Sequence, residues 1–266
     1  IGTDAFGNND TIVNVTLPEG VTSIGSSALR DCSQLASISL PQTLVEIKSS
    51  AFYGCSSLEE ITIPASVTTI SSSAFGNSVK KMTFAEGTTA IPDNACYNAY
   101  LLEEVVIPDT VTSIGSYAFR GCSQLGSIVL PNDLEEIKSY TFYDCSSLSG
   151  VVVPDSVTSI GSRAFYGCSA LDQMRLPSAL TSISSDAFKG CSALAEITIP
   201  AGVTSMSSGA FSNSVTKLTF AEGMTAIPDN ACYGANLLEE VVIPDTVTSI
   251  GSNAFRNCSQ LTSIAL

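Results

Sequence analysis

Nine cysteines give this 266-residue chain its most reactive side chains. Seven of them occupy one position of a unit that recurs along the sequence: Cys32, Cys55, Cys122, Cys145, Cys168, Cys191 and Cys258. If such units stack, these side chains point the same way, whereas a disulfide needs Cβ atoms that converge. Because free cysteine is among the most buried residues of folded proteins, the pattern favours a row of buried, reduced thiols over disulfides between units.

Catalysis and metal binding are both disfavoured by what the sequence lacks. It has no histidine, so a thiol nucleophile would lack its usual base. It also has no Cys-x-x-Cys pair, the commonest spacing of zinc ligands. We therefore expect no enzymatic activity, no catalytic residue, no cofactor and no metal site.

Acidic residues form a second recurring row, directly after one of the predicted strands: Glu19, Glu86, Asp109, Asp155, Glu222 and Asp245. Neighbouring pairs in this row suggest calcium binding, but Ca²⁺ takes about six to eight oxygens from a looped site. The sequence favours a solvated acidic edge. With 11 basic and 25 acidic residues the net charge is −14, which argues against a nucleic-acid partner.

The composition predicts a folded protein that does not insert into a membrane. Hydrophobic residues make up 44% of the chain and the mean hydropathy is +0.31, so there is ample material for a core. No apolar run approaches the about 20 residues of a membrane-spanning helix. No secretory signal opens the chain.

The recurring unit is 23 residues long, and residues 35–54 (LASISLPQTLVEIKSSAFYG) show its form. Twelve copies of its L-x-x-I-x-I segment begin at Ile12, Leu35, Leu58, Val79, Leu102, Leu125, Leu148, Leu171, Leu194, Val215, Leu238 and Leu261. Residues 79–130 and 215–266 match at 43 of 52 positions, an offset of 136. In each block one unit lacks two residues, after Phe75 or Phe211. We predict a single domain over residues 1–266, built from two homologous six-unit blocks.

Each unit contains two short stretches rich in β-branched residues, such as 58–63 and 67–70, which predict short strands. A unit of this size cannot bury a core alone, but stacked units can, and stacking aligns their strands in parallel. The predicted core is a ladder of inward side chains, one per rung of the stack. Its members include Phe52, Phe119, Phe142, Phe165 and Phe188, with Cys122, Cys145, Cys168 and Cys191 beside them.

The unit resembles the BspA-like, or Treponema-type, leucine-rich repeat, and residues 122–144 (CSQLGSIVLPNDLEEIKSYTFYD) follow that pattern closely. The resemblance covers essentially the whole chain. It implies a right-handed leucine-rich-repeat solenoid of twelve rungs with short parallel strands, mostly β with little regular helix. It also implies a cell-surface or secreted protein that adheres to host or bacterial proteins.

The outward strand positions suggest where a protein partner could bind. Three valines stand on consecutive rungs, where solvated strands usually carry polar residues, and an arginine follows on the next rung. The predicted binding face comprises Glu104, Val106, Val129, Val152, Gln173 and Arg175. The alternative is that these valines serve strand propensity alone.

Two functions remain open from the sequence. The preferred one is a non-catalytic protein-binding and adhesion module, and the alternative is a structural spacer or self-assembling stalk with no specific ligand. Because the chain opens within a unit at Ile1 and closes at Leu266 without a polar capping unit, we expect a fragment of a longer repeat protein. Uncapped ends would also allow end-to-end self-association.

Overall fold

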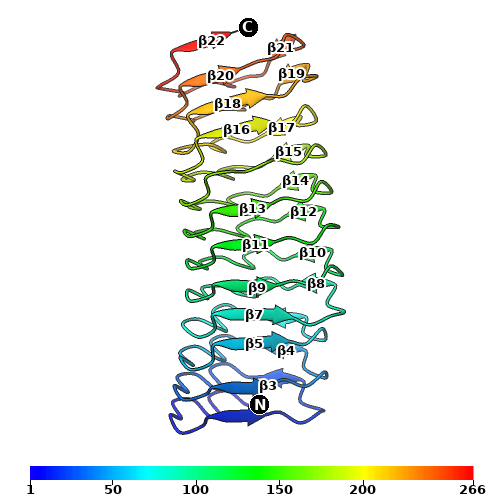
Figure 1. Cartoon of the computed structure of the whole chain (residues 1–266), viewed down its shortest axis with the longest axis vertical. Helices are drawn as coiled ribbons and strands as arrows, with labels where there is room; N and C mark the ends of the chain where they lie inside the picture. Colours follow the sequence, from blue (N-terminus) through cyan, green and yellow to red (C-terminus); the bar gives the residue numbers. More distant parts are fainter. Residues whose placement is uncertain (266) are drawn as a thin grey trace. The chain divides into compact units, whose positions relative to one another are not determined.

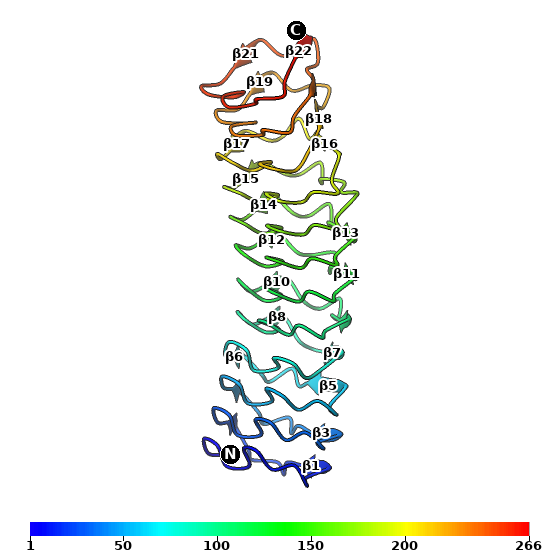
Figure 2. The same ribbon diagram turned by 90° about the vertical axis from the view of Figure 1, so that its left-hand side faces the viewer.

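A computed structural model describes residues 1–265, which form two compact units: Ile1–Pro131 (unit 1), and unit 2, which begins at Asn132. Each unit is a stack of rungs, one rung per sequence repeat, as Figure 1 shows. A rung contributes one strand to a first series and one to a second series. Figure 2 shows the two series on opposite sides of each stack. None of the described residues is helical.

The strands are short in both units. In unit 1 the first series is β1 (Asn14–Thr16), β3 (Ser37–Ser39), β5 (Glu60–Ile63), β7 (Lys81–Phe84), β9 (Glu104–Val106) and β11 (Ser127–Val129). The second series there is β2 (Ser23–Ile24), β4 (Glu46–Ile47), β6 (Thr69–Ile70), β8 (Ala90–Ile91) and β10 (Ser113–Ile114).

Unit 2 repeats this arrangement. Its first series is β13 (Gly150–Val152), β16 (Glu196–Ile199), β18 (Lys217–Phe220), β20 (Glu240–Val242) and β22 (Ser263–Ala265). Its second series is β12 (Glu136–Ile137), β14 (Ser159–Ile160), β15 (Ser182–Ile183), β17 (Ser205–Met206), β19 (Ala226–Ile227) and β21 (Ser249–Ile250).

Strands pair in parallel with the equivalent strand of the next rung. Asn14 is opposite Ser37 in the first series of unit 1, and Ser159 is opposite Ser182 in the second series of unit 2. Side chains alternate along each strand, so that in β5 Ile61 is buried between two exposed residues. This alternation lets one face of each strand build the core while the other meets solvent. The predicted coil of short parallel strands is confirmed.

The interior of each unit contains stacked aromatic rings. In unit 2, Phe142, Phe165, Phe188 and Phe211 stack successively, with ring centroids 5.3–5.5 Å apart and rings within 14° of parallel. In unit 1, Phe52 and Phe75 stack in the same way at 5.3 Å. Phe119 and the four cysteines that the sequence places in the ladder are also fully buried. Phe6, on the first rung, is 42% exposed.

Every rung turns a corner around its ladder residue, with one left-handed residue two positions before it and another two positions after it. In the rung of Phe52 these are Ser50 at φ 57° and Gly54 at φ 75°. Bulky residues also adopt this conformation, among them Tyr140 at 60° and Arg163 at 55°. For L-residues other than glycine, asparagine and aspartate it is unfavourable. The requirement was not predicted from the sequence, because this position also carries serine, tyrosine and arginine.

The thiols satisfy a backbone acceptor on the neighbouring rung. Cys168 Sγ donates to the Phe142 carbonyl at 3.1 Å, and Cys55 Sγ donates to the Leu29 carbonyl at 3.0 Å. On the rung after each 21-residue repeat, the cysteine is replaced by Ala99 or Ala235, so this thiol donor is missing there. A buried serine supplies it instead.

Ser78 Oγ donates to the Phe75 carbonyl at 2.8 Å, and Ser214 Oγ donates to the Phe211 carbonyl at 2.7 Å. Both serines are almost completely buried. The loss of a cysteine is thus matched by a hydroxyl from the preceding rung. This explains why a serine follows the two-residue deletion in both blocks.

We expect Ser214→Ala to lower the free energy of unfolding by about 1–3 kcal/mol, the usual cost of leaving a buried acceptor unsatisfied. Ala235→Cys in the same protein is expected to recover part of this loss, because it restores the thiol donor found on other rungs. Urea unfolding curves of the single and double variants measure both effects. A double variant no more stable than Ser214→Ala would contradict the idea that the serine hydroxyl replaces the thiol donor.

Candidate functional site

The structure distributes the predicted binding face over both units. Glu104, Val106 and Val129 belong to unit 1, whereas Val152, Gln173 and Arg175 belong to unit 2. Exposure separates the valines: Val129 is 82% and Val152 is 79% exposed, against 39% for Val106. That the six residues form one continuous face stays a prediction.

Glu104 is part of an ion pair that recurs in the other unit. Its carboxylate lies 2.8 Å from Lys81 Nζ, and the equivalent Glu240 lies 3.0 Å from Lys217 Nζ. In each pair the hydrogen bond that the lysine donates to the carboxylate is the main cause that raises the pKa of the lysine. Val106 also has an equivalent, Val242, at 38% exposure. Glu104 and Val106 therefore give unit 1 nothing that unit 2 lacks.

The unit 2 residues are more distinctive. Arg175 Nη1 forms an ion pair with Asp155 Oδ1 at 3.0 Å, and both side chains remain largely exposed. Gln173 forms a single parallel bridge with Gly150, which opens the strand that carries Val152. An exposed valine, a guanidinium and a carboxylate thus occur on two neighbouring rungs.

The sheet is interrupted next to Arg175. The sequence predicts a strand over residues 171–176, but apart from the Gln173 bridge these residues form none, and Figure 1 draws no arrow between β13 and β16 on that side. Within the described residues β16 is the outermost strand of the sheet β16-β18-β20-β22. The second series is unbroken here, since β15 pairs with β17. The two rungs are therefore joined on one side and separated on the other.

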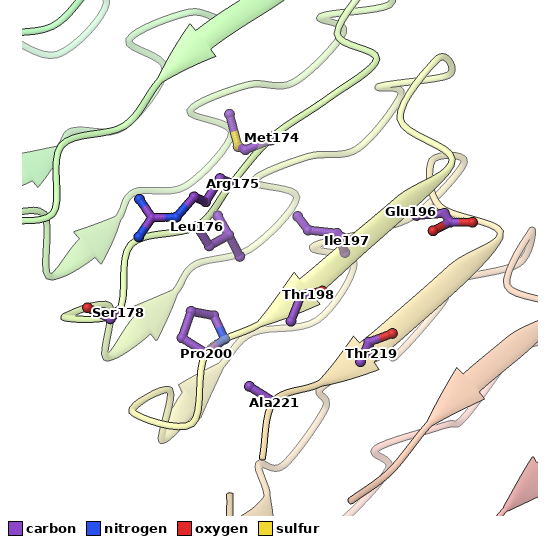
Figure 3. A pocket seen from close by; sticks show the side chains of 10 residues that line it. All are labelled: Met174, Arg175, Leu176, Ser178, Glu196, Ile197, Thr198, Pro200, Thr219 and Ala221. Carbon is purple, nitrogen blue, oxygen red and sulfur yellow. The ribbon is translucent and has the colours of Figure 1, made fainter. Parts of the chain in front are cut away.

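A cleft of about 440 Å³ lies at this interruption. Figure 3 shows its wall formed by Met174, Arg175 and Leu176 on one rung and by Ile197 and Thr198 on the next. The lining is completed by Ser178, Glu196, Pro200, Thr219 and Ala221. The cleft combines apolar side chains with a guanidinium and a carboxylate at its rim.

Unit 1 contains an equivalent cleft of about 310 Å³ between β3 and β5, which no sheet joins. Its lining includes Ser37, Ile38, Ser39 and Leu40, each 136 residues before a residue that lines or flanks the unit 2 cleft. Ser37 and Ser39 stand where unit 2 has Gln173 and Arg175. The guanidinium is therefore specific to unit 2.

Both clefts precede a 21-residue rung, and we attribute them to its missing residues. The deletion shortens the loop from the corner of that rung to the next first-series strand. Each short rung pairs over four residues with the rung after it, from Glu60↔Lys81 to Ile63↔Phe84 in unit 1. The short rung therefore pairs with the rung after it and not, in the first series, with the rung before it. The signal was present in the sequence, but its effect on the sheet was not predicted.

The thiols are poorly suited to chemistry. Eight of the nine cysteines are buried, Cys258 is partly exposed, and all nine are present as thiols. Burial raises the pKa of Cys55 and Cys191 to about 12 and that of Cys168 and Cys232 well above 9.0. A nucleophilic cysteine needs the opposite shift.

Over residues 1–265, no group of three or more acidic or cysteine side chains is arranged to hold a metal ion. No helix of the described chain has the length and apolar character to cross a membrane.

Three solved structures illustrate what the chain is similar to. A leucine-rich repeat protein from Bacteroides ovatus is 31% identical over 100% of this chain and 70% of its own, with a TM-score of 0.81. The T. pallidum leucine-rich repeat protein is 23% identical over 76% of this chain and 82% of its own, with a TM-score of 0.52. A leucine rich cell surface protein from Faecalibacterium prausnitzii is 27% identical over 91% and 82%, but its TM-score of 0.42 supports no structural argument.

No curated protein matches the chain significantly. The model of the BspA type leucine rich repeat region matches residues 1–125, 89–219 and 225–266, with six copies. These ranges cover almost all of the sequence and include the two units that carry the clefts. The chain belongs to the BspA-type leucine-rich repeat family.

Proposed function

We propose that this chain is a non-catalytic protein-binding and adhesion module of a cell-surface or secreted repeat protein. The family supports a binding scaffold, because stacked repeats present extended surfaces and the fold itself carries no fixed chemistry. The surface location rests on the resemblance to BspA-like proteins. The partner we propose is a host matrix or surface protein.

The observation that carries the proposal is the exposure of Val152 beside the Arg175–Asp155 ion pair. Val152 is 79% exposed on a strand face, and the cleft opens on the rung after it. Apolar surface rimmed by polar groups marks interaction sites, and arginine is enriched among the residues that dominate binding energy. An apolar side chain of the partner fits the cleft, and a partner carboxylate could compete with Asp155 for Arg175.

The alternative of a structural spacer is favoured by the similarity of the two blocks. They match at 43 of 52 positions over residues 79–130 and 215–266, which suits a uniform rod. A spacer has no reason to keep Arg175 in one cleft and Ser39 in the other. A binding module should therefore lose affinity when residues specific to unit 2 are substituted, whereas a spacer should not.

The double variant Val152→Lys with Arg175→Glu is expected to bind a partner at least tenfold more weakly than wild type, since one hot spot contributes more than about 1.4 kcal/mol. Binding of immobilised protein to a panel of purified extracellular-matrix proteins measures this. Val242→Lys, at the same strand position on another rung, is the matched control and should bind normally. Equal binding by all three proteins would favour the spacer.

A further inference from the structure

The tyrosines of this chain are gathered at the corners of the rungs. Seven of the eight lie either two residues before or directly after the ladder position that phenylalanine usually fills: Tyr53, Tyr97, Tyr117, Tyr140, Tyr143, Tyr166 and Tyr233. The same two positions carry five of the eleven basic residues: Arg30, Arg120, Arg163, Lys189 and Arg256. Neither the repeat pattern nor the core requires these residue types, because glycine, serine and asparagine stand there on other rungs.

In unit 2 six of these positions form one continuous cluster, which we call the corner patch: Tyr140, Tyr143, Arg163, Tyr166, Asp186 and Lys189. The rings of Tyr143 and Tyr166 stack at 4.7 Å, only 6° from parallel. Tyr140 lies against Tyr143 at 5.6 Å. Lys189 Nζ is 5.8 Å from the centre of the Tyr166 ring. Aromatic faces and cations thus alternate over three consecutive rungs.

Ion pairs and a hydrogen bond hold the charged side chains of the corner patch in place. Arg163 Nη1 donates to Tyr140 Oη at 3.0 Å, and its Nε donates to Asp186 Oδ2 at 3.2 Å. Lys189 Nζ lies 3.6 Å from the other oxygen of Asp186. A surface whose long side chains are already ordered loses less conformational entropy on binding than a mobile one. Tyrosine and arginine are also the residues that interfaces enrich.

Charge is distributed unevenly around each rung. The seven-residue corner segment, 138–144 in one rung, contains seven of the eleven basic and six of the 25 acidic residues when summed over all rungs, a net charge of +1. The remainder of the sequence has four basic and 19 acidic residues, a net charge of −15. The corners therefore have a slight excess of positive charge in a chain that is otherwise strongly acidic.

We propose that the corner patch binds the acidic edge of a second copy of this chain, where the acidic edge is the exposed row Asp155, Glu222 and Asp245. Glu222 and Asp245 hold the same repeat position on adjacent rungs, at the strand spacing of about 4.8 Å. Arg163 and Lys189 hold different repeat positions on adjacent rungs, but both contact the Asp186 carboxylate, at 3.2 Å and 3.6 Å, so the two cations also lie close together. A second copy offers a pair of exposed carboxylates that two neighbouring cations can contact. The contact is lateral, and it does not depend on the binding function proposed for the strand face.

The contact joins two different surfaces, so each copy offers one of each. Such heterologous association can continue from copy to copy. Its salt dependence follows from the charges. Raising the ionic strength from low values screens the repulsion between two chains of net charge −14 and favours association. Higher salt then weakens the ion pairs themselves.

A charge exchange between two variants tests the proposal. The corner variant is Arg163→Glu with Lys189→Glu, and the edge variant is Glu222→Lys with Asp245→Lys. By sedimentation velocity at about 0.15 M salt, wild type is expected to associate as its concentration rises, and each variant alone at least tenfold more weakly. An equimolar mixture of the two variants is expected to associate again, because each variant supplies the charge that the other has reversed.

Thermal unfolding checks that both variants fold. If the corner variant does not fold, the neutral variant Arg163→Gln with Lys189→Gln replaces it. A wild type that stays monomeric at millimolar concentration overturns the proposal. Wild type that is monomeric yet binds poly-glutamate also overturns it and assigns the patch to an acidic foreign partner. Association that both variants retain unchanged places self-contact elsewhere on the chain.

Discussion

Replacing Phe165 by alanine is expected to lower the free energy of unfolding by about 3–5 kcal/mol, the usual cost of truncating a buried phenylalanine. Phe165 is fully buried and stacks between two rings, with centroid distances of 5.3 Å to Phe142 and 5.4 Å to Phe188. Its removal leaves a cavity and deprives both neighbours of a contact face. Urea unfolding followed by circular dichroism measures the change.

Phe6→Ala is the matched control, because Phe6 holds the same position in its rung but is 42% exposed. Its substitution should cost well under half as much. The comparison isolates burial from residue type and from local backbone geometry. Similar losses in the two variants would show that the stability of the stack does not come from the phenylalanine ladder.

Raising the pH above 9 is expected to unfold the protein steeply. The thiol pKa values of Cys55 and Cys191 are raised to about 12, and those of Cys168 and Cys232 are raised well above 9.0, in each case chiefly by burial. In the unfolded chain these thiols ionise near 9.0, so between pH 9 and 12 the folded state binds more protons. Stability is complete below that range and falls by about 1.4 kcal/mol per pH unit for each thiol.

Four such thiols lower the free energy of unfolding by about 5–6 kcal/mol for each pH unit. The typical stability of a domain is therefore lost within about two pH units. The double variant Cys55→Ala with Cys191→Ala should lose about half of this slope. Ala99 and Ala235 show that alanine fits this position, but there a serine hydroxyl replaces the thiol donor. The test therefore compares slopes with pH and not absolute stabilities. Urea unfolding between pH 8 and 11 gives the slopes, and an unchanged slope in the variant would assign alkaline unfolding to other groups.

Periodicity explains why so much of the fold could be predicted. Twelve copies of one segment agree in register, and the apolar positions of each copy can only be buried by stacking, as for Ile61 and Ile197. A single short strand would be ambiguous, but the same alternation repeated rung after rung is not. Parallel pairing and the placement of the cysteines inside the stack followed from this repetition.

What the sequence did not predict lies where one rung differs from its neighbours. The strand expected at residues 171–176 is absent apart from one bridge, although the equivalent residues of unit 1 form β3 before the same kind of short rung. All three valines are exposed, but Val106 only to 39% against 82% for Val129, since position in the repeat does not reveal what neighbouring side chains cover. These effects depend on contacts between unlike rungs, which the pattern of a single rung cannot contain.

The interruption at the short rungs has a mechanical consequence. Where both series pair, as from β18 to β20 and from β19 to β21, backbone hydrogen bonds on both sides of the stack would share a lengthwise pull. Between residues 171–176 and β16 the first series does not pair. The rungs are held by the second series, as in Ile183↔Met206, by the corner, as in Phe188 N to Ala210 O, and by the bond from Ala193 N to Ser169 O. A lengthwise pull would therefore open the unpaired side of this junction while the second series acts as a hinge, and unit 1 would do the same between β3 and β5. The rungs on either side of each hinge would stay folded.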